Sequence, residues 1–465
     1  MINKNINRLL GGMLGLAVLA MFNSAKAQPV PVFTNLWGLA PLTFPGMTTN
    51  GNDMRGVAIA SLTTNVLISS RVGGTNQGVN LTPNHVNVVD FGTGTNLLAQ
   101  LKTVPSGSQF NLDKVGVADD GKVYGCNLTT GPTGVNQYFK IYQWPSESDT
   151  TTEALYVFDS TNYFNASVTL TNSFAWRMGD YMDVRGSGTN TEIVVVGNSA
   201  TSTNLVIFRP TDAALTNFLP IIIPTPVAGI SFAGSGVAFE GTNNAVWCRQ
   251  NASQNTRRLA YNPNTLTSSY THTNTVDQSV CQGLKYISLN GINMLATVQP
   301  SSTVNAAHRA RVFQIPGTPT GAFVSLLNAA TIPQLPGSLN GNALGQVDSR
   351  YGHIAFAAPG YGVAFYRVDF VTNSPPTNAV LSVSANPVVA GFNSSLSVTV
   401  AGTSPLTYIW SYTDGVTTNT VGSNTNVFTL APAQVTNTGT YFVTVTNLYG
   451  TTTSGSVNLT VLPGK

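Results

Sequence analysis

Residues 115–129 read Val-Gly-Val-Ala-Asp-Asp-Gly-Lys-Val-Tyr-Gly-Cys-Asn-Leu-Thr, and residues 139–144 read Phe-Lys-Ile-Tyr-Gln-Trp. Short apolar segments here alternate with small and polar residues, which is the pattern of β-strands packed on a core. Asp120 and Gly121 separate the first two segments, and an Asp-Gly pair supplies the positive φ that a tight hairpin needs. A calcium loop would need more oxygen side chains at alternate positions, so we interpret Asp119–Gly121 as a turn.

The same unit recurs between residues 55 and 370. Each copy contains two short strands joined by a turn, then one or two further strands that end in aromatic residues. The copies begin at Gly56, Gly116, Asp183, Gly229, Gly283 and Gly345. Their starts are on average about 58 residues apart, and sheet units with a period of roughly 40–50 residues indicate a β-propeller. We expect an all-β fold with six blades, and keep seven blades or a pair of β-sandwiches as alternatives.

The last copy has one strand too few for a four-stranded blade. It offers strands near Ala343–Val347, Ile354–Ala357 and Val363–Asp369, while the strand-like segment Val32–Leu39 belongs to no copy. Pairing that N-terminal segment with the last strand would complete the blade and remove an exposed sheet edge, which is a hazard for aggregation.

The first residues predict export. Lys4 and Arg8 precede the apolar stretch Leu9–Phe22, and the small residues Ala25 and Ala27 follow it. This order is typical of a secretory signal, here residues 1–27. The stretch is shorter than the ~20 residues that span a bilayer. We expect a secreted or extracellular protein without a transmembrane segment after signal removal, with surface association as an option.

Charge argues against nucleic acid as a partner. The 465 residues are 42% hydrophobic and only 8% charged, against about 25% charged in an average protein. Loss of Lys4, Arg8 and Lys26 with the leader would leave equal numbers of basic and acidic residues. No basic stretch interleaved with aromatic residues offers a surface that could follow a phosphate backbone.

The three cysteines predict neither a metal site nor a cofactor. Cys126, Cys248 and Cys281 have no Cys-x-x-Cys spacing and no neighbouring histidine, so a zinc site is not expected. Cys248 and Cys281 are candidates for a disulfide, but we favour three buried thiols.

Residues 115–129, 139–144 and Arg177–Asn190 carry a resemblance to a known family. They resemble exported bacterial proteins that have a propeller-like domain of unknown function, often followed by an immunoglobulin-like module. The resemblance covers most of residues 30–370. The resemblance implies a propeller-like fold and an exported location. It implies no activity, because no activity is settled for the family.

The C-terminal part resembles an immunoglobulin-like β-sandwich. We predict a propeller-like domain over 30–371, a proline-bearing linker over 372–378 and the sandwich over 379–463. Trp410 lies where such domains bury a tryptophan, and Tyr441 lies where they have a corner tyrosine. Val398 and Val443 occupy the positions of the usual disulfide, so this module must depend on apolar packing around Trp410.

Catalytic signatures are absent from the sequence. There is no H-E-x-x-H, G-x-S-x-G or Walker loop, and the four histidines are isolated from one another. Glycine pairs at 92–94 and 186–188 precede no helix that could add its dipole, so we interpret both as hairpin turns.

A propeller binds ligands over its central channel, where loops lead into the innermost strands. The polar residues of those segments that we select as candidate ligand-binding residues are Asp53, Arg55, Asp113, Lys114, Arg177, Asp180 and Asp183. Three weaker candidates follow in later copies: Asp277, Gln278 and Asn342. An alternative is that these charges pair with one another and hold the blades together, since an unpaired buried charge is costly.

Two functions fit this sequence. The first is an exported, non-enzymatic binding or scaffold protein that recognises glycan or protein, with the sandwich as a spacer or docking module. The second is an extracellular polysaccharide hydrolase or lyase. It would use Asp180 or Asp183 as acid or base and Arg55 or Lys114 to stabilise negative charge. Missing catalytic motifs favour the first.

Overall fold

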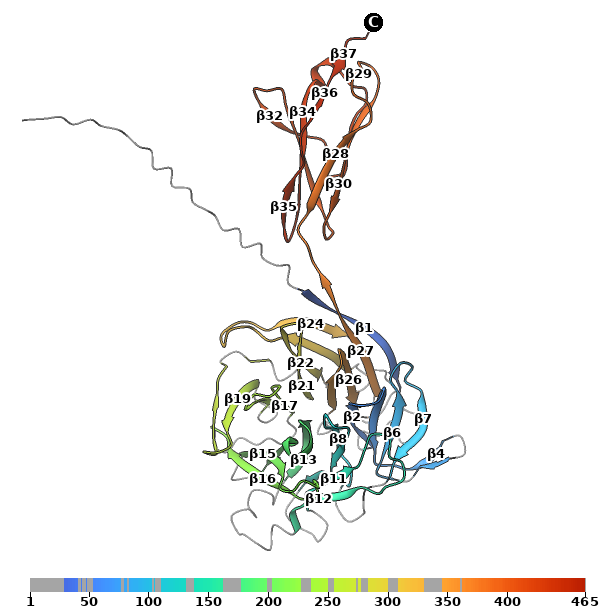
Figure 1. Ribbon diagram of the computed structural model, residues 1–465, viewed down its shortest axis with the longest axis vertical. Helices are drawn as coiled ribbons and strands as arrows, with labels where there is room; N and C mark the ends of the chain where they lie inside the picture. The colour runs from blue at the N-terminus through green and yellow to red at the C-terminus, as the bar shows by residue number, and fades with distance from the viewer. Residues whose placement is uncertain are drawn as a thin grey trace, which may run out of the picture. The chain divides into compact units, whose positions relative to one another are not determined.

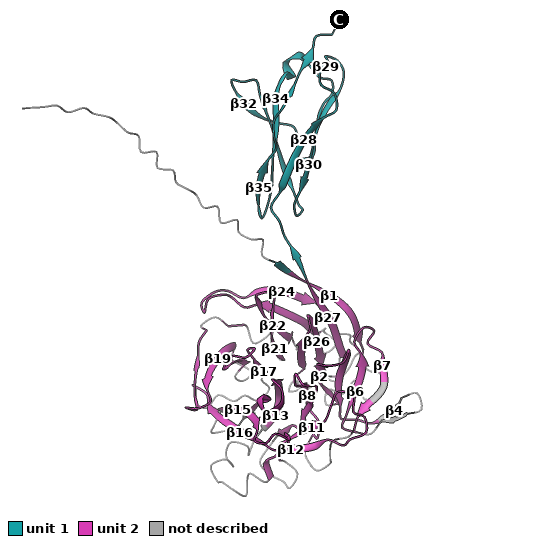
Figure 2. Cartoon of the chain, viewed as in Figure 1, with its two compact units in different colours: residues 1–30, 370–465 teal, residues 31–369 magenta. Residues whose placement is uncertain are grey.

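The computed structural model describes most of the chain from residue 29 onward. The described residues are 29–40, 43, 47, 53–76, 79–81, 83–102, 104, 110–130, 138–161, 177–198, 203–226, 236–249, 255–272, 275–276, 283–299, 308–329, 345–359 and 362–464. The predicted signal, the predicted repeat start at Gly229 and the residues Cys281, Asp277, Gln278 and Asn342 lie outside these ranges, as does the side chain of Arg177. The fold is all-β, and its strands divide between two compact units, residues 31–369 and residues 370–465 with the N-terminal segment (Figure 2).

The first unit contains six antiparallel sheets of four main strands, which we number I to VI in chain order. Sheets I and II consist of β2 (Met54–Ile59), β3 (Asn65–Ser70), β6 (His85–Asp90) and β7 (Asn96–Leu101), then β8 (Lys114–Val117), β9 (Val123–Cys126), β11 (Lys140–Trp144) and β12 (Leu155–Asp159). Sheets III and IV consist of β13 (Arg177–Arg185), β14 (Glu192–Asn198), β15 (Thr203–Pro210) and β16 (Phe218–Pro224), then β17 (Val237–Phe239), β18 (Ala245–Arg249), β19 (Thr256–Asn262) and β20 (Thr267–Tyr270). Sheets V and VI consist of β21 (Leu284–Leu289), β22 (Ile292–Gln299), β23 (Arg309–Gln314) and β24 (Val324–Ala329), then β25 (Gln346–Arg350), β26 (His353–Ala358), β27 (Gly362–Thr372) and β1 (Pro29–Leu39).

Smaller elements decorate these sheets. The short strand β10 (Thr129–Thr130) extends sheet III beside β13, β4 (Gly74–Asn76) pairs with β5 (Val79–Leu81), and the 3-10 turn η1 (Gly188–Asn190) follows β13.

The first strands of the six sheets contact one another in a cycle. In chain order, β2 packs against β8, β8 against β13, β13 against β17, β17 against β21, β21 against β25, and β25 against β2. Figure 1 shows β2, β8, β13, β17 and β21 toward the centre and β7, β16 and β24 toward the periphery. We call the side on which these innermost strands begin the start face, and the side on which they end the end face.

Burial on both faces of a sheet explains the continuous apolar runs of the sequence. In β3, Val66, Leu67 and Ile68 are all fully buried. Side chains alternate between the two faces of a strand, so Val66 and Ile68 pack with Phe365 of sheet VI, while Leu67 packs with Val115 of sheet II. Each sheet is therefore a layer between two others, and its strands carry apolar residues at successive positions.

The N-terminal strand completes sheet VI, as the sequence predicts. The strand order is β1-β27-β26-β25, so the segment at 32–39 joins the last strand of the unit. The Trp37 ring stacks on Phe365 with centroids 4.7 Å apart, and its Nε1 donates to the carbonyl of Phe91 at 2.8 Å. Trp37 thus connects the first strand of the chain to sheets VI and I together.

Side chains also join neighbouring sheets at their turns. Glu147, in the β11–β12 loop of sheet II, accepts hydrogen bonds from the backbone N–H groups of Ser61, Leu62 and Thr63 in the β2–β3 turn of sheet I. It also accepts from the Ser61 hydroxyl at 2.7 Å and the Thr63 hydroxyl at 3.0 Å. One buried carboxylate therefore satisfies a whole turn of the adjacent sheet.

The predicted hairpin at Asp119–Gly121 is present. Gly121 has φ +84°, and the Ala118 N–H donates to the carbonyl of Lys122 at 2.9 Å. The Asp120 carboxylate accepts from the backbone N–H of Lys122 at 3.2 Å and from that of Gly188 at 2.8 Å, which ties this turn to sheet III.

The start of the third repeat differs from the prediction. We expected its strand at Asp183, but β13 begins at Arg177 and contains an irregularity between Met178 and Met182. Gly179 has φ +94°, and a Cβ there would lie 1.9 Å from the Asn127 carbonyl oxygen. Only glycine fits this bulge. Periodicity misses it because polar and glycine residues interrupt the apolar pattern.

The second unit has the strand arrangement of an immunoglobulin-like sandwich. Its first sheet has the order β28-β30-β33, and its second the order β32-β31-β34-β35 with β36 also on β34. A parallel pair, β29 with β37, adds a further two-stranded sheet. The strands are β28 (Thr377–Val383), β29 (Val388–Val389), β30 (Ser394–Ala401), β31 (Thr407–Thr413), β32 (Thr418–Val421), β33 (Val427–Leu430), β34 (Gly439–Asn447), β35 (Gly450–Thr453), β36 (Val457–Leu459) and β37 (Val461–Leu462), with a 3-10 turn η3 (Val435–Asn437).

The core of this unit centres on Trp410. The residue is 1% exposed, and its Nε1 donates to the carbonyl of Thr425 at 2.8 Å. Val398 and Val443 are buried in the same cluster, where related sandwiches place their disulfide. The Tyr441 hydroxyl donates to the Asn437 carbonyl at 2.9 Å, which is the bond of a tyrosine corner.

We predict that Trp410→Ala unfolds the second unit. Loss of a buried tryptophan costs about 3–5 kcal/mol, and no disulfide between Val398 and Val443 can compensate for it. The matched control is Ile409→Ala on the same strand, because Ile409 is 45% exposed. Thermal unfolding of the full chain should show an early transition for Trp410→Ala only. An unchanged melting profile would contradict this account of the core.

Candidate functional site

Four of the predicted site residues lie together on the start face. Asp113 is fully buried, and its Oδ1 lies 3.0 Å from Arg55 Nη1 and its Oδ2 lies 2.8 Å from Lys114 Nζ. Arg71, which the sequence analysis did not select, forms a third ion pair with Asp113 Oδ1. The backbone N–H of Arg71 donates to the Asp53 carbonyl at 2.8 Å. We call these five residues the start-face cluster.

Burial and the neighbouring charges shift the pKa values of Asp113 and Lys114 in this cluster. Burial by itself would raise the pKa of the Asp113 carboxyl, but the positive charges of Arg55, Lys114 and Arg71 outweigh it and lower the pKa to about 2. Burial lowers the pKa of the Lys114 ammonium despite its contact with Asp113. The carboxylate is therefore the ionised centre on which the three cations converge.

Gln346 and Tyr181 link the innermost strands further along the ring. Gln346 Oε1 accepts from the N–H of Val57 at 3.1 Å and of Val115 at 3.3 Å, and its Nε2 donates to the carbonyl of Val115 at 2.8 Å. The Tyr181 hydroxyl, aimed inward by the β13 bulge, donates to the Leu284 carbonyl at 2.7 Å. These bonds satisfy backbone groups that the ring centre would otherwise leave without partners.

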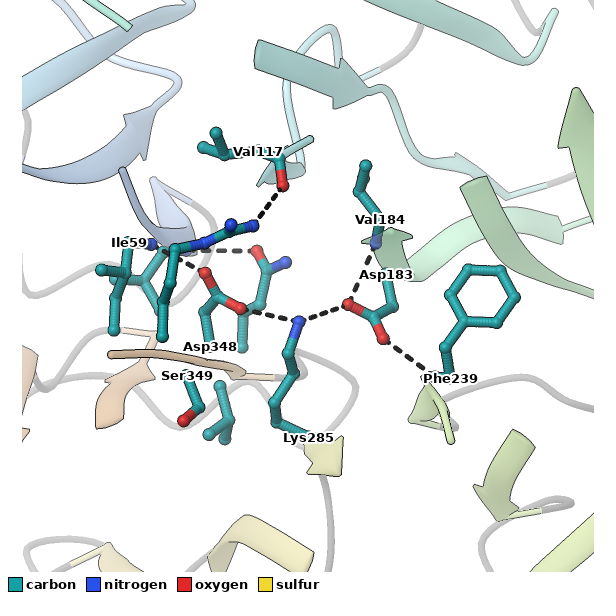
Figure 3. A network of polar contacts seen from close by, with 12 residues as sticks. Ile59, Val117, Asp183, Val184, Phe239, Lys285, Asp348 and Ser349 are labelled. Carbon is teal, nitrogen blue, oxygen red and sulfur yellow. Dashed lines mark hydrogen bonds and ion pairs between the residues drawn. The ribbon is translucent and has the colours of Figure 1, made fainter. Parts of the chain in front are cut away.

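A lysine between two carboxylates occupies the next level (Figure 3). Lys285 Nζ lies 2.7 Å from Asp183 Oδ1 and 2.8 Å from Asp348 Oδ1. The other oxygen of Asp183 accepts from the Phe239 N–H at 2.9 Å, and that of Asp348 accepts from the Ile59 N–H at 2.7 Å. This central bridge therefore connects sheets III, V and VI directly, and reaches sheets IV and I through backbone.

Electrostatics favour the charged form of the bridge. Burial would lower the pKa of Lys285, but Asp183 and Asp348 outweigh that effect and raise its pKa above the ordinary value. The ammonium of Lys285 and the two carboxylates therefore pair as ions and link the innermost strands.

The predicted site residues are thus distributed over several levels. Asp53, Arg55, Asp113 and Lys114 share the start-face cluster, and Asp183 belongs to the central bridge. Asp180 is 2% exposed and lies in the β13 bulge. Arg55 and Lys114 both form ion pairs with Asp113. Such pairs are expected under the alternative interpretation, in which these charges hold the sheets together instead of binding a ligand. The carboxylate of Asp183, proposed above as acid or base, pairs with Lys285 and accepts hydrogen bonds from two backbone N–H groups.

A cavity among the described residues lies at the end face, where the sequence predicts no site. Its volume is about 750 Å³, within the 300–1,000 Å³ range of small-molecule sites. Its lining consists of Asp119, Arg185, Gly186, Thr189, Asn190, Thr191, Glu192, Arg209, Gly241, Thr242 and Asn244. We call it the end-face cavity.

A smaller cavity adjoins it. This cavity measures about 260 Å³ and is lined in part by Asp183, Lys285 and Tyr286, and it shares Arg185 and Gly241 with the larger one. Asp183 and Lys285 of the central bridge therefore line a hollow that adjoins the end-face cavity.

Glycine turns shape the cavity rim. Gly186 has φ +78° and Gly188 φ +53°, so the predicted turn at 186–188 is confirmed. A Cβ on Gly186 would lie 2.3 Å from the Asn190 carbonyl oxygen, so the turn needs glycine there. This Gly-Ser-Gly turn and the turn at Asp119–Gly121 are the two parts of the cavity rim that the sequence predicts as turns. The other side of the cavity is the β17–β18 turn, about 55 residues later in the chain. No local sequence pattern predicts that these two turns lie side by side.

Other kinds of site have no counterpart in the described part of the chain. No three His, Cys, Asp or Glu side chains there group as metal ligands. The thiols of Cys126 and Cys248 are free and buried, and burial raises the pKa of Cys248 to about 12. No helix among the described residues is long and apolar enough to cross a bilayer.

Comparisons with known proteins give no family. No protein-family description matches this chain, and no curated protein is similar to it. Murine CEACAM1b is 16% identical, with a match covering 24% of this chain and 57% of that one at a TM-score of 0.16. The mouse nectin-like molecule 4 ectodomain is 15% identical over 47% of this chain and 73% of that one, at a TM-score of 0.18.

A Dscam1 fragment of four Ig domains, isoform 1.9, is 13% identical over 93% of this chain and 100% of that one, with a TM-score of 0.22. The chain thus spans little more than half of the first of these structures. Likeness this weak carries no argument, so the fold described above rests on strand order and packing.

We predict that Asp113 makes the stability of the protein acid-sensitive. Its pKa in the folded protein, about 2, is below the ordinary value of 3.8. Its contribution is therefore complete above about pH 4 and is lost as pH falls toward 2. Asp113→Asn should cost about 3–5 kcal/mol at pH 7, because three cations lose their carboxylate. Denaturant unfolding at several pH values measures this.

The difference in unfolding free energy between wild type and Asp113→Asn should shrink between pH 4 and pH 2. Glu153→Gln is the control, since it also removes one carboxylate, but Glu153 is exposed and lies outside the start-face cluster. A difference that stays constant over this pH range would contradict the assigned role of Asp113.

Proposed function

We propose that this chain is an exported, non-enzymatic binding or scaffold protein that recognises glycan at the cell surface or outside the cell. Residues 31–369 form in this proposal a closed six-bladed β-propeller. Two observations support closure: the cycle of contacts among the six innermost strands, and the place of β1 in sheet VI. A ring closed in this way has no free sheet edge.

The end-face cavity is the ligand site in this proposal, and its unused polar groups are the observation that carries it. Among the described residues, the side chains of Thr189, Asn190, Thr242 and Asn244 have no hydrogen-bond partner and line the cavity. Hydroxyl and amide groups both donate and accept. They match the hydroxyl groups of a sugar, which do the same.

Cavity shape favours a glycan over a protein surface. A standard protein interface buries about 800 Å² on each partner and is not a deep hollow, whereas small ligands sit in concave sites. The end-face cavity is concave and about 750 Å³ in volume. One or a few sugar residues would fill such a space.

The hydrolase alternative gains no support from the described carboxylates. Glycoside hydrolysis needs two carboxyl groups free for proton transfer and attack. In the cavity, Glu192 gives one oxygen to Arg185 and the other to Arg209, and Asp119 pairs with Arg350 at 2.9 Å. Both groups are held by guanidinium partners.

The remaining parts of the chain complete the proposal. Residues 1–27 are a signal that directs export, residues 372–378 are a linker, and the immunoglobulin-like domain at 379–463 serves as spacer or docking module. In the described residues of the linker and the immunoglobulin-like domain, no three His, Cys, Asp or Glu side chains group as metal ligands.

We predict that filling the cavity abolishes glycan binding. Thr242→Trp places an indole at the rim, and Thr242 is exposed without a side-chain partner, so the fold should tolerate the change. The control is Ser325→Trp, an exposed position on the outer strand β24. Purified full chain is applied to an array of neutral, uronate-containing and sulfated glycans.

Wild type and Ser325→Trp should bind the same subset of glycans, and Thr242→Trp should lose at least about tenfold in affinity for them. Absence of any bound glycan would overturn the proposal, as would capture of a protein partner with no glycan involved. Equal binding by Thr242→Trp would move the site away from this cavity.

A further inference from the structure

We propose that the ligand of the end-face cavity is an acidic saccharide and that Arg209 binds its anionic group. This inference rests on the proposed function and narrows it to one class of glycan. It follows from which charged groups around the cavity are already used within the protein and which are left for a ligand.

Arg185 has no donor left for a ligand. Its Nε donates to Glu192 Oε2 at 2.7 Å, and its Nη1 donates to the carbonyls of Gly241 at 2.7 Å and Asn243 at 2.8 Å. Its Nη2 donates to Glu192 and, at 3.0 Å, to the Tyr261 hydroxyl. A guanidinium has five N–H donors, so Arg185 is a structural clamp at the base of the rim.

Arg209 contacts Glu192 through only one edge of its guanidinium group. Its Nε donates to Glu192 Oε1 at 2.5 Å, and its Nη2 pairs with the same oxygen. Within the described residues the two Nη1–H groups and the second Nη2–H have no partner. The side chain is 38% exposed and lines the cavity. Glu192 fixes the orientation of the guanidinium, so the free edge is held ready for a ligand.

The ion pairs of the lining residues leave one guanidinium group over. The lining holds two guanidinium groups, those of Arg185 and Arg209, and two carboxylates, those of Asp119 and Glu192. Glu192 pairs with both Arg185 and Arg209, and Asp119 pairs with Arg350, which lies outside the lining. Arg350 neutralises Asp119 from the side of the ring, and Arg185 alone suffices to neutralise Glu192. The charge of Arg209 therefore remains for an anionic group, which a planar guanidinium binds through paired hydrogen bonds.

The rest of the lining indicates a sugar rather than a simple anion. The cavity volume of about 750 Å³ is far larger than one carboxylate or sulfate group needs. The unpartnered hydroxyls of Thr189 and Thr242 and the amides of Asn190 and Asn244 surround the remaining space. A ligand with one anionic group and several hydroxyls uses both parts of this surface.

The test compares glycans that differ in charge. The full chain is measured by biolayer interferometry against oligogalacturonate, a sulfated galactan and an uncharged galactan, with the array above as a wider screen. The acidic glycans should bind at least about tenfold more tightly than the neutral one, since a hydrogen bond to a charged group is worth about one such factor or more. Added salt should reduce that preference.

Arg209→Gln should remove the tenfold preference for acidic over neutral glycans, because the guanidinium that would bind the anionic group is replaced by a neutral amide. Arg367→Gln, a control with the same change in charge, should bind as wild type does, because Arg367 is exposed and pairs with Asp369 away from the cavity lining. Thr242→Glu provides a second variant in case Arg209→Gln does not fold. It adds a carboxylate at the rim and should weaken acidic glycans selectively by a similar factor.

The outcomes separate the two proposals. Tighter binding of uronate or of sulfate identifies which acidic group is recognised, and either result supports the inference. Neutral glycans bound as tightly as acidic ones, or a full preference retained in Arg209→Gln, would overturn the inference and leave glycan binding standing. No glycan bound by wild type, on the array or the sensor, would overturn the proposed function and this inference with it.

Discussion

The pairing of β1 with β27 is the constraint on which the rest of the first unit depends. It joins a segment from the start of the chain to the last strand of the sixth sheet, so six sheets pack in a cycle. Every sheet then has two neighbours, and apolar side chains can occupy both faces of each strand. Trp37 reinforces this junction by contacting Phe365 of sheet VI and Phe91 next to sheet I.

The cycle of contacts brings six innermost strands together, and their backbone groups and charges must find partners without water. The chain meets this need with few ionic groups, in keeping with its 8% of charged residues. Asp113 gathers three cations at the start face, and Lys285 joins two carboxylates deeper in the ring. Because these charges pair with one another, the ligand groups that we propose lie farther out, at the end-face cavity.

Local chemistry explains what the sequence could predict. The Asp-Gly turn after residue 118 is confirmed, as is the addition of an N-terminal strand to sheet VI, because turn residues and unpaired strand segments are visible in sequence. The sequence does not predict the β13 bulge, because the bulge needs glycine at position 179 only to make room for the carbonyl of Asn127, which is distant in sequence. Arg71 was missed for the same reason, since its partner Asp113 follows 42 residues later.

The candidate site was even harder to predict from sequence, because it too depends on contacts between residues that are distant along the chain. The residues chosen as ligand contacts were those that precede innermost strands, and Asp113 and Lys114 turn out to pair with each other. Arg209 lies on β15, the third main strand of sheet III, and Glu192 on β14 orients it at the cavity. No spacing rule in one sequence identifies such a residue, since its role depends on which neighbours have already used their donors.

The most direct test of this account is amide hydrogen exchange along β27 in the full chain. If β1 pairs with it, both edges of the strand are hydrogen-bonded, and the amides of residues 363–369 should exchange as slowly as those of β26. If every second amide of β27 exchanged rapidly, as at an open sheet edge, the ring would not be closed by the N-terminal strand.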